Sequence, residues 1–214
     1  MAEVDPLAIL REIYGPRLDL HSGIYQKSVA HRKEHGESEC DVYPSTAIGP
    51  MWDLLSAMLP ATRFLEMGCG LGYSAALMAE AGGPSAQVDT IEKSSLHANL
   101  AEQQISHAGL DSRVRILRGE ASEVLQDLKD PYDIVFVDAD WEDYPKWLEH
   151  FARLTRRGGL LISANLFPLF EEWAQYLPHK ESIQEYLTAI VHDKRFKTHI
   201  VRDKWEALSY RVQG

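Results

Sequence analysis

Three glycines at alternate positions lie between a short apolar run and a helical segment. They are Gly68, Gly70 and Gly72, in the run Phe64-Leu65-Glu66-Met67-Gly68-Cys69-Gly70-Leu71-Gly72-Tyr73-Ser74. Glycine adopts positive φ at no steric cost and lets the backbone approach a ligand that any Cβ would push away. A dinucleotide fingerprint needs G-x-G-x-x-G, but Tyr73 directly follows Gly72. The spacing therefore predicts a nucleotide-type cofactor without a required pyrophosphate, and it argues against a nicotinamide-dependent oxidoreductase.

A carboxylate follows about twenty residues later, at the end of the run Gln87-Val88-Asp89-Thr90-Ile91-Glu92. An acid at the carboxyl end of the second strand of such a sheet faces the crevice beyond the strands and accepts from ribose hydroxyls. We therefore expect Glu92 to bind a ribose. The alternative is an exposed acid at the start of the next helix.

Three further segments carry polar residues after predicted strands. They are Arg118-Gly119-Glu120-Ala121-Ser122, the run from Ile134 to Tyr144, and Gly158-Gly159-Leu160-Leu161-Ile162-Ser163-Ala164-Asn165. With the glycine run and Glu92, they resemble the class I S-adenosylmethionine-dependent methyltransferases, and among these the catechol and caffeoyl-coenzyme-A type O-methyltransferases. The resemblance runs from about residue 43 to the C-terminus.

The resemblance implies a set of cofactor contacts. Glu66 supports the glycine loop or the cofactor ammonium, Asp138 lies near that ammonium, and Tyr43 or Ser45 touches the methionine end. Ala121 and Ser122 match the residues that contact adenine, although Ser122 is also a candidate helix N-cap. The full set implied for the cofactor is Glu66, Gly68, Gly70, Gly72, Ser74, Glu92, Ala121, Ser122, Asp138, Tyr43 and Ser45.

Two positions depart from the family. There, an aspartate after the fourth strand and an Asp-Asn pair after the fifth hold a divalent metal, and a lysine three residues beyond the first aspartate is the base. Asp138 and Asn165 match, but Ala164 replaces the aspartate of the pair and Trp141 replaces the lysine. Losing a carboxylate lowers both the charge and the ligand number of a Mg²⁺ site. Asp138 and Asn165 are thus remnant positions unless Asp140 or Ser163 compensates, and we expect no tightly bound metal.

The base is left open between several groups. The acceptor proton goes to Asp140, to His31 or His35 on a polar arm, or to water. His31 and His35 are otherwise surface histidines rather than metal ligands. Trp141 and Asn165 are the expected acceptor contacts, and Trp141 alternatively covers the core.

Composition narrows the class of protein. The 214 residues are 45% hydrophobic and 25% charged, which suits one α/β domain. A formal charge of −10 argues against a nucleic-acid partner, although Arg156-Arg157 or Arg32-Lys33 leaves a local basic pocket open. Two cysteines far apart, Cys40 and Cys69, indicate a reduced cytoplasmic protein. We expect no membrane span, and a homodimer is left open.

Short apolar runs alternate with helical segments from residue 47 onwards. The pattern predicts a Rossmann-like, doubly wound α/β fold, with a mainly parallel seven-stranded sheet, helices on both faces and a C-terminal antiparallel hairpin. The expected strands are 63–67, 87–91, 114–117, 133–137, 160–164, 198–201 and 207–212. The expected helices of this part are 47–59, 73 onwards, 96–107, 122–128, 144–154 and 182–193.

Residues 1–46 are expected to precede this core as a helix and an arm. A first helix, opened by Asp5-Pro6, should bury Leu7, Leu10, Ile13 and Tyr14 and end at Gly15-Pro16. The polar stretch 18–45 reads as an irregular arm or lid over the acceptor.

The interpretation as a whole is a single methyltransferase domain, 1–214, that methylates a hydroxyl of a small aromatic acceptor. Alternatives are a nitrogen, thiol or modified RNA base as acceptor, and an inactive cofactor-binding protein.

Overall fold

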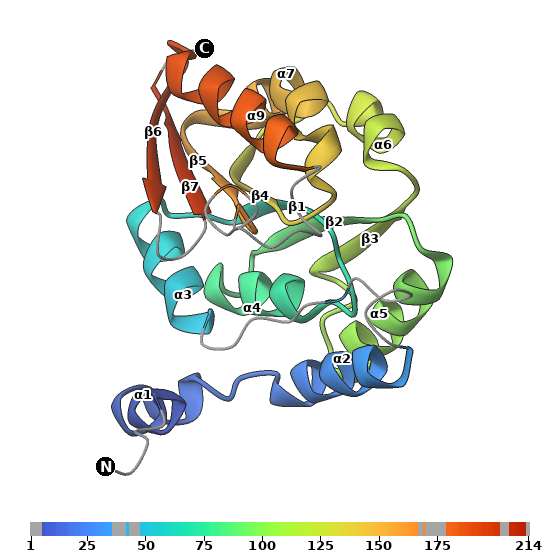
Figure 1. Ribbon diagram of the computed structural model, residues 1–214. Helices are drawn as coiled ribbons and strands as arrows, with labels where there is room; N and C mark the ends of the chain where they lie inside the picture. The colour runs from blue at the N-terminus through green and yellow to red at the C-terminus, as the bar shows by residue number, and fades with distance from the viewer. Residues whose placement is uncertain are drawn as a thin grey trace, which may run out of the picture. The chain divides into compact units, whose positions relative to one another are not determined.

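The computed structural model describes residues 6–35, 42, 48–166, 169, 179–201 and 206–212. The helices, with η for 3-10 turns, are α1 Pro6–Tyr14, η1 Gly15–Arg17, α2 Ser22–His35, α3 Gly49–Met58, α4 Tyr73–Ala81, α5 Ser95–His107, α6 Ala121–Asp127, η2 Trp141–Asp143, α7 Tyr144–Leu154 and α9 Lys180–His192. The strands are β1 Arg63–Met67, β2 Gln87–Glu92, β3 Val114–Arg118, β4 Tyr132–Val137, β5 Thr155–Ser163, β6 Phe196–Val201 and β7 Glu206–Arg211 (Figure 1).

The strands form one seven-stranded sheet in the order β3-β2-β1-β4-β5-β7-β6. The pairs β1–β4, β2–β3 and β4–β5 are parallel, whereas β7 pairs antiparallel with both β5 and β6. This confirms the predicted mainly parallel sheet, with helices around it and a C-terminal hairpin. Parallel strands end at the same edge, so residues that follow β4 and β5 begin neighbouring loops.

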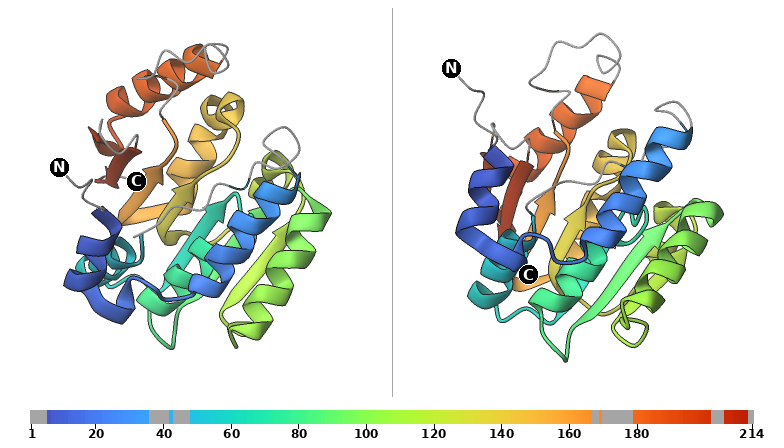
Figure 2. Two further views of the ribbon diagram at one scale, coloured as in Figure 1. Left: turned by 60° about the horizontal axis from the view of Figure 1, so that its bottom comes forward. Right: turned by 90° about the horizontal axis from the view of Figure 1, so that it is seen from below.

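By its contacts the chain divides into two compact units. The first comprises Met1–Thr62 and Cys69–Arg118, and the second comprises Arg63–Gly68 and Gly119–Gly214. In the first, α4 packs on β2 and β3, α5 packs on the same strands, and α2 packs against α4 (Figure 2). In the second, α7 and α9 pack side by side, and α9 also packs on β6 and η2 (Figure 1).

The predicted irregular arm is in part a helix, and the prediction was wrong there. Residues 22–35 form α2, which carries His31 and His35 four residues apart. Polar and charged residues lie on most sides of this helix, so its sequence shows little apolar periodicity. Only a narrow strip formed by Ile24 and Ser28 is fully buried. The Ser28 hydroxyl donates to the carbonyl of Ile24 at 3.0 Å, so this polar side chain is satisfied inside the helix.

The predicted buried face of the first helix was also wrong. On α1, Ile13 is 67% exposed and Tyr14 is 46% exposed. On α3 the fully buried residues are Trp52 and Ser56, whereas Leu54 and Met58 are exposed. Apolar periodicity shows which face of a helix is hydrophobic, but it does not show that another element covers that face.

One strand begins earlier than predicted. β5 starts at Thr155, five positions before the expected Leu160, and Thr155 is in register with Tyr132 of β4. Its first residues are polar, so their pattern favoured a loop. Arg156 pairs with the carboxylate of Asp133, which neutralises the guanidinium on this strand. Arg156 therefore lies in a structural ion pair within the second unit.

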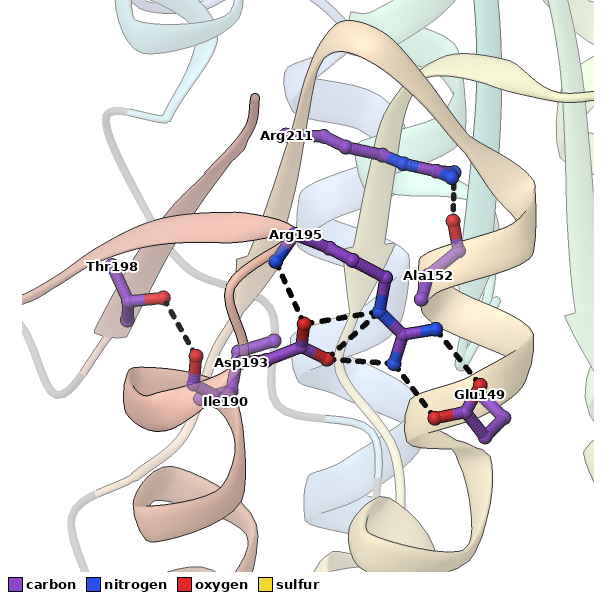
Figure 3. A network of polar contacts seen from close by, with 7 residues as sticks. All are labelled: Glu149, Ala152, Ile190, Asp193, Arg195, Thr198 and Arg211. Carbon is purple, nitrogen blue, oxygen red and sulfur yellow. Dashed lines mark hydrogen bonds and ion pairs between the residues drawn. The ribbon is translucent and has the colours of Figure 1, made fainter. Parts of the chain in front are cut away.

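An ion-pair network holds the hairpin against α7 and α9 (Figure 3). Arg195, just before β6, binds the carboxylate of Asp193 and donates to Glu149 of α7 at 2.7 and 2.8 Å. Arg211 of β7 donates to the carbonyl oxygens of Ala152 and Thr155. These contacts fasten the last two strands to the helices of the second unit.

We expect Asp193→Asn to lower the free energy of unfolding by about 1–2 kcal/mol at pH 7, because the Asp193 carboxylate is mostly buried and bound to Arg195. The Arg195 hydrogen bond lowers the pKa of Asp193 in the folded protein. The stabilisation is thus present above the unfolded pKa of about 3.9 and is lost as pH falls through the lower folded value. Urea unfolding of both proteins from pH 7 to 3 measures it.

The matched control is Glu149→Gln, because Glu149 is exposed and solvent screens its charge. It should change stability by less than about 1 kcal/mol. An Asp193→Asn variant as stable as the parent at pH 7, or a difference that grows on acidification, contradicts the assignment.

Candidate functional site

The glycine loop has the positive φ angles that its sequence predicted. Gly68, Gly70 and Gly72 have φ of +95°, +52° and +87°, and Gly72 is the N-cap of α4. At Gly68 the requirement comes from the chain itself, because a Cβ there would lie 1.9 Å from the carbonyl oxygen of Asp138. A Cβ at Gly70 would lie 3.3 Å from the side chain of Val42. The loop is therefore built for close approach of backbone to its surroundings.

Glu92 lies at the end of β2 with 7% of its surface exposed. One carboxylate oxygen accepts from the backbone N–H of Gly70 at 3.0 Å and the other accepts from the N–H of Ser94 at 2.8 Å. The alternative of an exposed acid is thus wrong. Both carboxylate oxygens are thus engaged by backbone N–H groups, and a carboxylate oxygen can accept more than one hydrogen bond.

Three histidine rings lie in successive contact, and the first of them lies next to Glu92. His97 of α5 is buried, and its Nδ1 lies 3.9 Å from a Glu92 oxygen. The ring of His31 contacts the ring of His97, with centroids 5.2 Å apart, and the His35 ring lies 4.2 Å from that of His31. Burial, together with these two neighbours, lowers the pKa of His31. His31 is therefore a half-buried contact of α5, half-buried His35 packs on His31, and sequence reasoning missed His97.

Asp138 and Asn165 follow β4 and β5 and meet in the second unit. The register pairs Val137 with Ser163, so the two loops begin side by side. The side-chain amide of Asn165 donates to Asp138 Oδ1, and Asn165 has a φ of +58°. Both residues are half-buried. The side chains of Asp138 and Asn165 are therefore in direct contact.

Tyr144 contacts both of these loops through its hydroxyl group. It is fully buried at the start of α7, and its hydroxyl lies 3.2 Å from the carbonyl oxygen of Val137 and 3.4 Å from that of Ala164. The same hydroxyl accepts from the N–H of Ala139 at 3.3 Å. Burial, followed by the charge of Asp138, raises the pKa of Tyr144 well above its usual value. Tyr144 therefore remains neutral, and its hydroxyl links the loop after β4, which carries Asp138, to the loop after β5.

We expect Tyr144→Phe to lower the free energy of unfolding by about 1–3 kcal/mol, because buried backbone groups of both loops lose a partner. Urea unfolding measures the change. Tyr210→Phe is the matched control, since Tyr210 is 44% exposed and its loss should be small. If Tyr144→Phe is as stable as the parent, then the Tyr144 hydroxyl does not stabilise the two loops.

Trp141 is fixed by polar and aromatic contacts. Its indole N–H donates to the backbone carbonyl of Asn165 at 2.7 Å. Its ring lies 4.9 Å from the ring of His179, between centroids. Trp141 is half-buried, so it both covers the loops and keeps part of its surface accessible.

The donor set after β4 and β5 does not suit a divalent metal. Ala164 has no side-chain oxygen, Asp138 Oδ1 accepts from Asn165, and the backbone carbonyl of Asn165 accepts from Trp141. Ser163 is fully buried and pairs with the hydroxyl of Tyr186 at 2.6 Å, so it does not compensate. Across the described part of the chain, His, Cys, Asp and Glu form no group of three suited to a metal ion. Mg²⁺ prefers an octahedron of oxygen donors, which these residues do not provide.

The other predicted residues have mixed outcomes. Glu66 is fully buried in β1, and Ser74 lies in the first turn of α4. Asp140 is exposed and precedes η2. Glu120, not Ser122, is the N-cap of α6, so Ala121 and Ser122 are the first helical residues. Tyr43 and Ser45 lie outside the described residues, and their predicted role stays a prediction. Within the described ranges, no helix combines the length and apolar character needed to cross a membrane.

Comparison with known proteins identifies the family. The family model described as O-methyltransferase matches residues 29–202. The chain belongs to the O-methyltransferase family. A catechol O-methyltransferase of Niastella koreensis is 34% identical over 122 residues, which are 55% of this chain and 55% of that protein. The chain thus matches about half the length of such curated relatives.

Solved structures match the fold over nearly the whole chain. An O-methyltransferase from Bacillus cereus, solved in complex with SAH, has a TM-score of 0.76 at 23% identity and covers 95% of this chain and 96% of that chain. The SAH-bound methyltransferase PaMTH1 of Podospora anserina has a TM-score of 0.80 at 18% identity and covers 100% of both chains. At these identities the likeness establishes the Rossmann-like methyltransferase fold.

Proposed function

We propose that this protein is an S-adenosylmethionine-dependent methyltransferase that methylates a hydroxyl group of a small aromatic acceptor without a tightly bound metal. The observation that carries the proposal is Glu92, whose carboxylate is held by backbone N–H groups of Gly70 and Ser94. That is where a methyltransferase of this fold needs a ribose acceptor. Membership of the O-methyltransferase family and the name of the Niastella koreensis relative support the hydroxyl acceptor.

The residues divide the work of binding. Glu92 accepts hydrogen bonds from the ribose hydroxyls, and the glycine loop admits the cofactor close to its backbone. Asp138 accepts from the cofactor ammonium, which its partly buried carboxylate favours electrostatically. Ala121 and Ser122 contact the adenine. When bound, S-adenosylmethionine supplies a methyl group that is already activated by a sulfonium.

The protein then has to align the acceptor, exclude water and accept a proton. Trp141 contributes a half-buried aromatic wall to the acceptor. Asn165 keeps Asp138 in place through its side-chain amide. No step needs a Lewis acid when a protein base takes the proton of the acceptor hydroxyl.

Two measurements test the proposal. The first is titration calorimetry with S-adenosylhomocysteine. The second is a panel of acceptors, each scored by a mass gain of about 14 daltons, which is one CH₂ per methyl transfer. The panel contains catechol, a phenol, an aryl amine, an aryl thiol and a short RNA. We expect binding of S-adenosylhomocysteine and a mass gain on catechol. Gain only on the amine, thiol or RNA contradicts the hydroxyl acceptor, and binding with no gain on any acceptor favours an inactive cofactor-binding protein.

A further inference from the structure

A histidine and a carboxylate outside the predicted site lie next to Trp141. His179 is the N-cap residue of α9, and Glu142 belongs to η2. The Nδ1 atom of His179 lies 3.3 Å from a carboxylate oxygen of Glu142. This Nδ1 is buried and completes no hydrogen bond of good geometry among the described residues. A buried imidazole nitrogen needs a partner, and the Glu142 carboxylate is within reach of a small rotation.

Contacts within the second unit tie this pair to the loops after β4 and β5. The His179 ring packs against the Trp141 ring, whose N–H donates to the carbonyl of Asn165. Asn165 in turn donates to Asp138. These contacts therefore connect His179, through Trp141 and Asn165, to Asp138. Asp138 is the carboxylate that we assign to the cofactor ammonium.

The chemistry of the pair is that of an oriented base. A carboxylate beside one imidazole nitrogen holds the proton there and leaves the other nitrogen as an acceptor. Such a carboxylate also stabilises the imidazolium that forms on proton transfer. An indole has no basic nitrogen, so Trp141 cannot replace the lysine that the family uses.

We propose that His179 is the general base of the methyl transfer and that Glu142 is the positioning residue that orients its ring. This rests on the proposed function. His179 Nε2 removes the proton of the acceptor hydroxyl while the oxygen forms a bond to the methyl carbon. The bond from that carbon to sulfur breaks, and its electron pair stays on sulfur as a neutral thioether. The imidazolium then releases its proton to water.

Other candidate bases in the second unit fit the role less well. Tyr144 is fully buried beneath the loops and stays neutral. Asp138 Oδ1 is engaged by Asn165. Asp140 is exposed, so water competes with an acceptor hydroxyl for its carboxylate. Among the described residues, the charged group in contact with His179 is Glu142 of η2. Asp143, next to Glu142, pairs with Lys146, and Lys180 and Glu181 follow His179 directly in α9.

The test uses the whole protein with catechol and with 4-nitrocatechol, whose hydroxyl is more acidic. His179→Gln and His179→Ala should lower kcat for catechol about 100-fold or more, which is the range for losing a general base. The loss should be much smaller for 4-nitrocatechol, because that acceptor ionises without help. Glu142→Gln should give an intermediate loss. His192→Ala, at the other end of α9, and Glu185→Gln are the matched controls and should keep the parent rate.

A second readout does not depend on turnover. Nitrogen-15 NMR of the histidine rings should show that the ring signals of His179 change in Glu142→Gln, because Nδ1 loses its facing carboxylate, and should show no change in Glu185→Gln. The proposal is overturned by an active parent whose rate on catechol is unchanged in folded His179→Gln, by equal losses on both acceptors, or by His179 ring signals that are the same in Glu142→Gln as in the parent. A parent that binds S-adenosylhomocysteine but methylates none of the panel instead overturns the proposed function, and the base assignment with it.

Discussion

Gly68→Ala should abolish binding of S-adenosylhomocysteine and lower the free energy of unfolding by about 3 kcal/mol or more. Two costs add: an alanine at φ +95° is strained, and its Cβ would meet the Asp138 carbonyl oxygen at 1.9 Å. That oxygen belongs to the backbone and has no side-chain rotamer to relieve the contact. The loop after β4 must move, and Asp138 moves with it. Urea unfolding and calorimetry measure the two effects.

Gly83→Ala is the matched control, because Gly83 also has a positive φ, of +75°, but a Cβ there meets nothing within 4 Å. It should cost about 1–2 kcal/mol from backbone strain and leave ligand binding unchanged. If both variants lose the same stability and Gly68→Ala still binds S-adenosylhomocysteine, then the contact with Asp138 is not the reason that position 68 requires a glycine.

Glu92→Ala should weaken binding of S-adenosylhomocysteine by about 1.5–3 kcal/mol, which is roughly 10- to 150-fold in Kd. Two ribose hydroxyls lose a charged acceptor in a buried place. The N–H groups of Gly70 and Ser94 also lose their acceptor, so the glycine loop loosens. Glu92→Gln should give a smaller loss, because the amide oxygen still accepts but carries no charge. Calorimetry at one salt concentration compares the three proteins.

Glu123→Gln, on the exposed side of α6, is the control for removing one negative charge, and it should bind as the parent does. Thermal melting of each variant separates loss of binding from loss of fold. Parent-like affinity in a folded Glu92→Ala variant would show that the ribose is bound elsewhere.

The strand pattern was predictable because its signal is local. The buried strands are continuous apolar runs between turn residues, and β1 and α7 were placed at their observed ends. Glycines with positive φ and the carboxylate at the end of β2 were predictable for the same reason. Each depends on a few adjacent residues and on the direction of one strand.

Contacts between distant segments were not predictable from one sequence. The burial of His31 depends on His97, 66 positions later, and the position of His179 depends on Glu142 and Trp141. No local pattern signals such pairs. The exposed face of α1 shows the converse case, since its apolar spacing was read correctly but the burial it implied was not. Helix α2 was missed because its surface is polar nearly all round.

The most direct test of metal-independent methyl transfer is turnover of catechol with methyl-labelled S-adenosylmethionine in EDTA, compared with turnover in added Mg²⁺ or Mn²⁺. The Ala164→Asp variant is measured beside the parent, because it adds a carboxylate at the end of β5, next to Asn165 and Asp138. The account predicts equal parent rates in EDTA and in metal, because Asp138 and Asn165 bind each other and supply too few oxygen donors to offset the dehydration of Mg²⁺. Parent activity that vanishes in EDTA and returns with added metal would contradict it.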